Sequence, residues 1–311
     1  MTIERARVLA QPKPWGIGDL GPWSDQRHEQ ALIGELSYER ADASSAASSL
    51  LLKLLFTSAP LSIQVHPDDS YARSIGLPNG KTEAWYVLSA APGAQIALGL
   101  KQPVTQPQAR RAIDDGTILE LVAWRPVKTH DVISIPAGTI HAIGAGIAIA
   151  EIQQRSDVTF RLYDHGRARP LDIQGGLAVA KLGPAEVTVP PKRLTKERQL
   201  LVANSYFVFE RIELAAGTSW CLNAERETWL FVVSGSLDAG SFILARGEAV
   251  LAQSERVEIR AGRMGVECLV AYSGRGGPIP LLLQPISPPN TSKQRPPGKR
   301  LPPVASVRTT L

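Results

Sequence analysis

The chain has 311 residues, 44% of them hydrophobic and 20% charged, which is enough to bury a core without disulfide or metal staples. Its formal net charge is +5, but the excess lies wholly after Ile286, in a segment without acids that contains Lys293, Arg295, Lys299, Arg300 and Arg308. Residues 1–286 are therefore neutral overall. This argues against a nucleic-acid partner, because that function needs a basic, aromatic-rich face.

The N-terminal residues are polar and charged and lack the apolar run of a signal peptide. The longest apolar stretch, SLLLKLLF at 49–56, is too short to cross a bilayer and predicts a buried strand. Two cysteines, Cys221 and Cys268, have no metal-type spacing, so we expect small core residues in a reducing compartment. A cytoplasmic protein without a membrane partner is expected.

The 26 glycines and 24 prolines separate short runs rich in Val, Ile, Leu and Phe, a pattern typical of an all-β sandwich or barrel. Beginning with the run at 49–56, strands are predicted at 61–66, 83–90, 94–100, 131–137 and 146–154. One helix is predicted at 107–115, before Gly116, with a short apolar segment after it. The first barrel is expected to close near Gly166.

Later runs predict a second, smaller β unit, with strands within 205–214, 228–237, 241–252 and 268–273. The last 25 residues hold six prolines and no apolar periodicity, which predicts a disordered tail. We therefore expect a metal-binding domain at 1–187, a second domain at 188–286 and a tail at 287–311. The tail has no assigned role.

All five histidines lie at or before position 165: His28, His66, His130, His141 and His165. A histidine-based metal site must therefore belong to the first unit. The two-residue period of a strand places Gln64 and His66 on one face, and likewise Lys81 and Glu83 if that strand already includes Lys81. Together with His141, the residues Gln64, His66 and Glu83 could form a nitrogen and oxygen ligand set that suits a catalytic Zn²⁺ with an open position.

The Q-x-H strand, the later Glu83 and the P-A-G-T-I-H turn resemble the two sequence signatures of the cupin superfamily. More specifically, the chain resembles the short bacterial form of type I mannose-6-phosphate isomerase. The resemblance rests on PLSIQVHPDD at 60–69, GKTEAWYVL at 80–88 and IPAGTIHAIGAGIAIAEIQQRSDVTFRLYDHGR at 135–167. The resemblance extends over most of residues 12–167. It also includes KPWG around Trp15, the IGE segment ending at Glu35, and LLLKLLF within the run at 49–56.

This resemblance implies a mainly β fold of two cupin-type jelly-roll barrels, the second degenerate, with a few short helices. It implies interconversion of mannose 6-phosphate and fructose 6-phosphate through a cis-enediolate, with a hexose phosphate as the small-molecule partner. One zinc ion per chain would be bound by Gln64, His66, Glu83 and His141. The oligomeric state stays open between monomer and homodimer.

For catalysis, the resemblance places Arg161 in the site as an electrostatic stabiliser of the enediolate. Lys81 and Asp157 are acid/base or substrate-positioning groups, in an order the sequence does not resolve. Glu151 is a further candidate for the substrate site, with an equal alternative as a hydrogen-bond acceptor that orients a ligand. Asp157 and Arg161 could instead form only an ion pair. Lys81 is the first choice for the phosphate.

One departure from the family pattern and two alternative functions qualify this interpretation. Long family members carry N-H-K-P-E where this chain has Asn79-Gly80-Lys81-Thr82-Glu83, so the identity of the base is open. The alternatives are a metal-cupin oxygenase, which Gln64 argues against, and a non-catalytic sugar-phosphate-binding cupin. The other polar residues are given surface roles: His28 and His165 partly exposed, Arg167 and Arg169 solvated.

Overall fold

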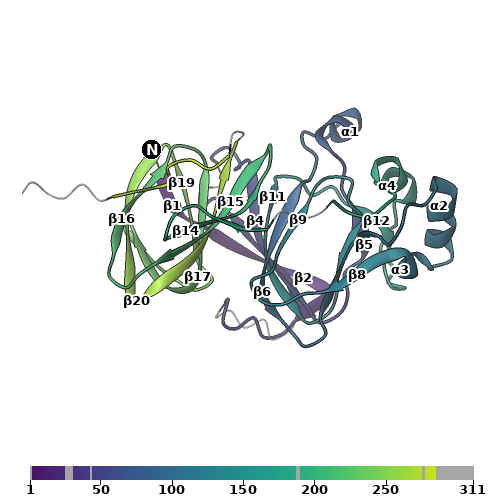
Figure 1. Cartoon of the computed structure of the whole chain (residues 1–311), viewed down its shortest axis with the longest axis horizontal. Helices are drawn as coiled ribbons and strands as arrows, with labels where there is room; N and C mark the ends of the chain where they lie inside the picture. The colour runs from purple at the N-terminus through teal and green to yellow at the C-terminus, as the bar shows by residue number, and fades with distance from the viewer. Residues whose placement is uncertain (1, 25–30, 43, 187–189, 275–276, 285–311) are drawn as a thin grey trace, which may run out of the picture.

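The structure, a computed structural model, describes residues 2–24, 31–42, 44–186, 190–274 and 277–284. Within these ranges the chain forms 21 strands and four short helices, so the mainly β fold expected from the sequence is confirmed. The cupin barrel of each half stays a prediction. Figure 1 shows the strands of the C-terminal half at one end and helices α2, α3 and α4 at the other.

The N-terminal half contains two antiparallel sheets. The six-stranded sheet has the order β2 (Arg7–Ile17), β3 (Ile33–Glu39), β4 (Leu50–Thr57), β11 (Ile147–Gln154), β6 (Glu83–Ala90) and β9 (Val132–Ile135). The five-stranded sheet has the order β12 (Phe160–Tyr163), β5 (Ile63–Val65), β10 (His141–Ile143), β7 (Gln95–Leu100) and β8 (Val122–Pro126).

Apolar side chains from both sheets meet in one buried cluster, so the sheets pack face to face. Val87 and Ile149 come from the six-stranded sheet, and Ile96 and Leu98 from the five-stranded one. The other face of the five-stranded sheet is covered by helices α2 (Gln106–Asp114), α3 (Ile118–Leu121) and α4 (Ile173–Val179). Helix α1 (Asp69–Ser74) follows β5.

The C-terminal half is a single ten-stranded antiparallel sheet that encloses its own apolar core. One of its strands comes from the N-terminus of the chain: β1 (Thr2–Arg5) pairs with β19, although about 250 residues separate the two strands. Its other strands are β13 (Lys192–Arg193), β14 (Arg198–Ala203), β15 (Phe207–Leu214), β16 (Ser219–Ala224), β17 (Thr228–Ala239), β18 (Phe242–Ala245), β19 (Ala249–Gln253), β20 (Glu255–Ser273) and β21 (Leu282–Leu283).

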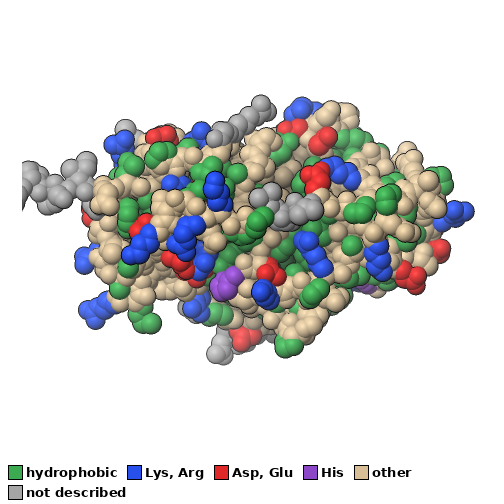
Figure 2. All heavy atoms as spheres, in the orientation of Figure 1, with side chains coloured by type: hydrophobic (Ala, Val, Ile, Leu, Met, Phe, Trp, Pro, Cys, Tyr) green, Lys and Arg blue, Asp and Glu red, His purple; other side chains and the backbone are tan. Residues whose placement is uncertain are grey.

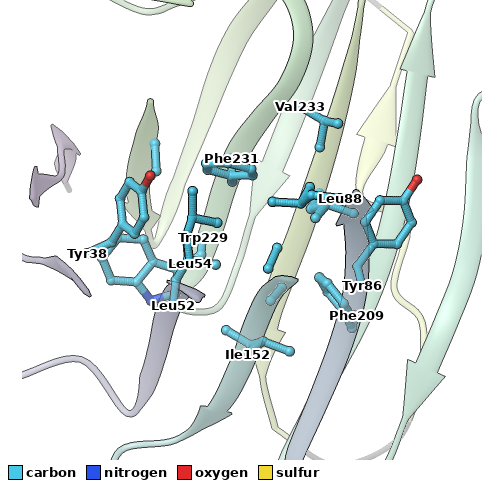
Figure 3. Close-up of a cluster of buried hydrophobic side chains, with 14 of the residues drawn as sticks. Tyr38, Leu52, Leu54, Tyr86, Leu88, Ile152, Phe209, Trp229, Phe231 and Val233 are labelled. Atoms are coloured by element: carbon cyan, nitrogen blue, oxygen red, sulfur yellow. The ribbon is translucent and has the colours of Figure 1, made fainter. Parts of the chain in front are cut away.

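A third apolar cluster joins the two halves (Figure 3). Leu52, Leu54 and Ile152 project from the six-stranded sheet toward Trp229 and Phe231 of β17. Because side chains alternate along a strand, the same sheet turns its other face toward the five-stranded sheet. The central strands β4 and β11 of this sheet are thus buried on both faces, which explains why all eight residues of each are buried.

Most predicted strands and the helix at 107–115 occur within one or two residues of their expected ends. The elements that were not predicted include helices α1, α3 and α4 and strands β1, β2, β3, β10, β12, β14 and β16. The single strand predicted at 241–252 is two strands, β18 and β19. Cys268 is buried as expected, whereas Cys221 is half-buried. The predicted domain boundary at 187–188, the tail at 287–311 and His28 lie outside the described residues.

Acidic and basic side chains are interspersed on the face drawn in Figure 2. Among the described residues, no helix has the length and apolar character needed to cross a membrane.

The core between the halves predicts a large stability effect for Phe231→Ala. Phe231 is 1% exposed and contacts Tyr38 edge to face, with ring centroids 5.6 Å apart. We expect the free energy of unfolding to fall by about 3–5 kcal/mol, because the truncation leaves a cavity. Chemical denaturation would measure the change. Met264→Ala, at a side chain 92% exposed, should change stability by less than about 0.5 kcal/mol; equal effects would contradict a shared core.

Candidate active site and metal centre

Three buried side chains from separate strand ends meet in the N-terminal half. His66 follows β5, Glu83 begins β6, and His141 begins β10. One ligand atom from each lies within 4.8 Å of those of the other two. The Nε2 of His66 is 3.3 Å from Oε1 of Glu83, and the Nε2 of His141 is 3.8 Å from Oε2. The three sequence-predicted residues therefore form a single cluster.

Backbone carbonyls orient both imidazoles toward Glu83. Nδ1 of His66 lies 2.8 Å from the Val158 oxygen, and Nδ1 of His141 lies 2.8 Å from the Thr139 oxygen. A carbonyl oxygen only accepts, so each Nδ1 is the protonated donor. In the neutral ring Nε2 then carries a free lone pair, which points into the cluster. A carbonyl that fixes the imidazole in this way is typical of metal-binding histidines.

The electrostatics of the cluster favour the protonation states that a cation requires. Burial, followed by the nearby Lys81, lowers the pKa of His66 to about 3, and burial lowers the pKa of His141. Burial alone would raise the pKa of Glu83, but Lys81 and His66 outweigh it and hold that pKa well below its usual value. Neutral imidazoles and an ionised carboxylate are the forms that bind metal ions.

Gln64, the fourth predicted ligand, lies beside this cluster. Its Nε2 is 3.3 Å from Nε2 of His141, while its Oε1 accepts a hydrogen bond of 3.1 Å from the Ser62 hydroxyl. Ligation through Oε1 requires the amide to turn over. The Ser62 hydroxyl accepts as readily as it donates, so both orientations of the amide are satisfied.

Lys81 reaches the cluster by a different route from the one expected. Lys81 would share a strand face with Glu83 only if the strand included Lys81, but β6 begins at Glu83. Lys81 nevertheless contacts the Glu83 carboxylate, and its Nζ is 3.2 Å from Nε2 of His66. Burial opposes its charge, yet Glu83 and Glu151 outweigh that effect and raise the pKa of Lys81.

A cavity of about 380 Å³ opens beside the cluster. Its lining includes Gln64 together with five basic residues, Lys13, Lys53, Lys81, Arg161 and Arg169. Three acids also line it, Glu35, Glu151 and Asp157. This cavity brings together every predicted catalytic and substrate-binding residue, in polar surroundings that suit a charged, hydroxyl-rich ligand.

The predicted catalytic residues differ in their environments. Arg161 on β12 donates to the Pro170 oxygen at 2.9 Å, and its buried Nε has no hydrogen-bond partner among the described residues. Glu151 on β11 is buried and accepts from the Trp85 indole at 2.8 Å. Asp157 has a side chain that is 89% exposed, 3.6 Å from Lys53. The Asp157–Arg161 ion pair considered from the sequence is absent among the described residues.

The expectation that Arg169 is a solvated surface residue is wrong. Its Nε donates to the buried Asp164 at 2.7 Å, and its guanidinium lies 4.5 Å from the centre of the Trp15 ring, in the cavity wall. Arg167 donates to the same carboxylate. No local pattern signals this contact, because Trp15 lies about 150 residues away. Lys53, a single charge inside an apolar run, was a signal that could have marked a wall residue.

Two curated proteins that are similar in sequence to this chain share one name, mannose-6-phosphate isomerase. The chain is 38% identical over 182 residues to a mannose-6-phosphate isomerase of Streptococcus mutans, and 32% identical over 211 residues to the mannose-6-phosphate isomerase ManA of Bacillus subtilis. These alignments cover 56% and 63% of this chain. They span 57% and 62% of the two relatives' own lengths. No protein-family model matches the chain.

Over these aligned segments the chain is similar to mannose-6-phosphate isomerases. The resemblance drawn from its motifs is thereby confirmed, and its fold agrees. The crystal structure of the mannose 6-phosphate isomerase from Bacillus subtilis superimposes with a TM-score of 0.76 over 88% of this chain and 100% of that one, at 21% identity. A zinc-bound mannose 6-phosphate isomerase superimposes with a TM-score of 0.68 at 15% identity, over 88% of this chain and all of that one.

The donor set of this chain fits a divalent cation. Both oxygens of the Glu83 carboxylate are buried and accept no well-aligned hydrogen bond from any described residue, although the Lys81 ammonium contacts Oε1. A buried carboxylate without donors is costly unless a cation compensates it. Two imidazole lone pairs beside that carboxylate complete a site for a borderline ion.

The geometry predicts that His141→Ala weakens metal binding. Removing one of two imidazoles should lower the affinity of the chelator-stripped protein for a divalent ion by at least roughly tenfold. Competition titration against a chromophoric chelator would measure it. His165→Ala is the matched control, because His165 bonds to the Leu61 oxygen outside the cluster. Equal losses in both variants would contradict the assignment.

Proposed function

We propose that this chain interconverts mannose 6-phosphate and fructose 6-phosphate by moving a proton between C2 and C1 of the open-chain sugar. The observation that carries the proposal is one buried cluster of His66, Glu83 and His141 beside a polar cavity, whose lining includes Arg161 and Glu151. The homologous relatives named mannose-6-phosphate isomerase supply the substrate class.

The proposal includes one Zn²⁺ per chain, held by His66, Glu83, His141 and the Oε1 of Gln64. When bound, zinc supplies a Lewis acid for the sugar oxygens. The fit rests on the buried carboxylate and the two oriented imidazoles, and the name of the zinc-bound structural neighbour agrees with it. The chain's own residues must then hold the sugar and move the proton.

Two positively charged residues of the cavity lining, Arg161 and Lys81, supply charge to the reaction in this scheme. Removal of the C2 proton places negative charge on the two sugar oxygens, and fixed positive charge lowers the cost of that step. Arg161, which lines the cavity, serves this role, and its buried Nε has no hydrogen-bond partner among the described residues. Lys81 is held against Glu83 and contributes charge and substrate positioning.

Glu151 is the best placed of the acidic candidates to move the proton. Burial, and then Glu83, raise its pKa to about 7, and a base with a pKa near the working pH transfers protons most efficiently. Its Oε2 accepts from Trp85, which leaves Oε1 for the substrate. The exposed Asp157 is assigned to substrate positioning, with Lys53 as its partner.

The first test is turnover by the purified full chain. We expect conversion of mannose 6-phosphate in a coupled assay, loss of activity in a strong chelator and recovery on adding Zn²⁺. Anaerobic conditions should leave the rate unchanged, because isomerisation consumes no oxygen. An oxygen requirement would point to an oxygenase instead. Binding of a hexose phosphate without turnover would point to a non-catalytic binding protein.

Glu151→Gln tests the proton-transfer role. The amide keeps a bond to the Trp85 indole but cannot take a proton, so kcat should fall by about 10²–10⁴-fold with KM little changed. Metal content should stay at the wild-type level, since Glu151 is outside the ligand set. Glu120→Gln, an equivalent change at an exposed site on α3, should leave kcat unaltered. A near-normal kcat for Glu151→Gln would remove Glu151 from the mechanism.

A further inference from the structure

The segment 79–82 carries Lys81 to the cluster but belongs to no strand or helix. A charged side chain on an irregular segment is held in place only if the backbone around it is fixed by other groups. Each of its three amides from 80 to 82 has a partner. The Gly80 amide donates to Oδ1 of Asp69 at 2.9 Å, the Lys81 amide to the Pro67 oxygen at 2.9 Å, and the Thr82 amide to Oε1 of Gln154 at 3.0 Å.

Two of these three partners are linked to each other. Nε2 of Gln154 donates to the same Oδ1 of Asp69, at 2.9 Å. The backbone N–H of Gln154 also donates to the backbone oxygen of Thr82, at 3.2 Å. Asp69 at the start of α1 and Gln154 at the end of β11 therefore form one clamp across the segment. Asp69 has a second, weaker partner in Arg73 at 3.7 Å.

The residues on either side of Lys81 are those that this clamp needs. A Cβ at position 80 would lie 2.4 Å from the Asp68 carbonyl carbon and 2.5 Å from the Pro67 oxygen, both backbone atoms. Gly80 thus permits the close approach on which its bond to Asp69 depends. Thr82 supplies an amide hydrogen for Gln154, which a proline at that position lacks.

We propose that Asp69 and Gln154 are positioning residues for Lys81. They fix the backbone of 79–82 so that the Lys81 ammonium rests against Glu83. Neither touches the cluster: Asp69 acts through the Gly80 amide and Gln154 through the Thr82 amide. The kinetic consequence of this inference rests on the proposed function, whereas the placement of Lys81 does not.

The test compares Asp69→Ala with Asp69→Asn by amine-reactive labelling of the folded full chain, followed by peptide mapping. Lys81 is 6% exposed, and Lys53, on a regular strand, is 8% exposed and serves as the internal reference. Loss of two hydrogen bonds should raise the labelling rate of Lys81 by roughly tenfold while that of Lys53 stays constant. An asparagine side chain keeps an acceptor oxygen, so Asp69→Asn should lie near the wild type.

Activity gives the second readout. In Asp69→Ala we expect kcat to fall by roughly tenfold or more, because a small displacement of a charged group is costly in catalysis. Asp69→Asn should restore most of the loss. Asp114→Ala, at an exposed acid paired with Arg110 on α2, is the control and should behave as wild type in both measurements.

Each outcome decides the matter. Unchanged Lys81 labelling in Asp69→Ala overturns the inference. Increased Lys81 labelling with an unchanged kcat overturns only the kinetic consequence of the inference. If Asp69→Ala raises the labelling rate of Lys53 as well, the fold has loosened and the variant does not isolate the clamp. Gln154→Leu, which breaks the bond to the Thr82 amide, then decides: the ratio of the Lys81 rate to the Lys53 rate should rise, and an unchanged ratio overturns the inference. If the wild type turns over no sugar phosphate, the proposed function fails while the labelling result still decides the clamp.

Discussion

The N-terminal half is organised around one buried negative charge. Glu83 is 1% exposed, and a carboxylate out of water is stable only when paired or bound to a cation. The Lys81 ammonium contacts it directly. The two imidazoles, held by carbonyl acceptors, turn lone pairs toward it, so a cation bound between them would complete the compensation, with Gln64 at the edge. The first half is built to collect these groups from β5, β6 and β10, whose relevant positions are far apart in the chain.

The C-terminal half contributes to this site without adding a residue to the cluster. Its β17 covers the face of the six-stranded sheet opposite the cavity, and Glu227, just before β17, accepts the Ser49 and Leu50 amides at the beginning of β4. A sheet buried on both faces is held rigidly, because apolar packing resists displacement from either side. That rigidity serves β4, β6 and β11, which carry Lys53, Trp85 and Glu151 into the cavity. The second half thus supports the sheet that lines the cavity.

Features that depend on local interactions could be predicted from the sequence, whereas features that depend on contacts between distant residues could not. Strand runs such as 49–56 and 83–90, and the alignment of Gln64 with His66, depend on the local period of two, which is visible in the residues. Lys81 was placed near Glu83 for the wrong local reason, since the strand starts two residues later. The contact of Arg169 with Trp15 and the pairing of β1 with β19 join residues far apart in sequence. No periodicity encodes such pairings; they depend on how the sheets pack.

The departure from N-H-K-P-E is better understood as a change of support than as a loss. A histidine at position 80 would bring a Cβ into the backbone of 67–69, and a proline at 82 would remove the donor that meets Gln154. In this chain, Asp69 and Gln154 bond to the backbone of the segment that holds Gly80, Lys81 and Thr82. The lysine is retained while the means of holding it differ. A motif read only at its chemical residues would miss this, because one compensating group lies 11 residues before Gly80 and the other 72 residues after Thr82, within hydrogen-bond distance but outside the motif.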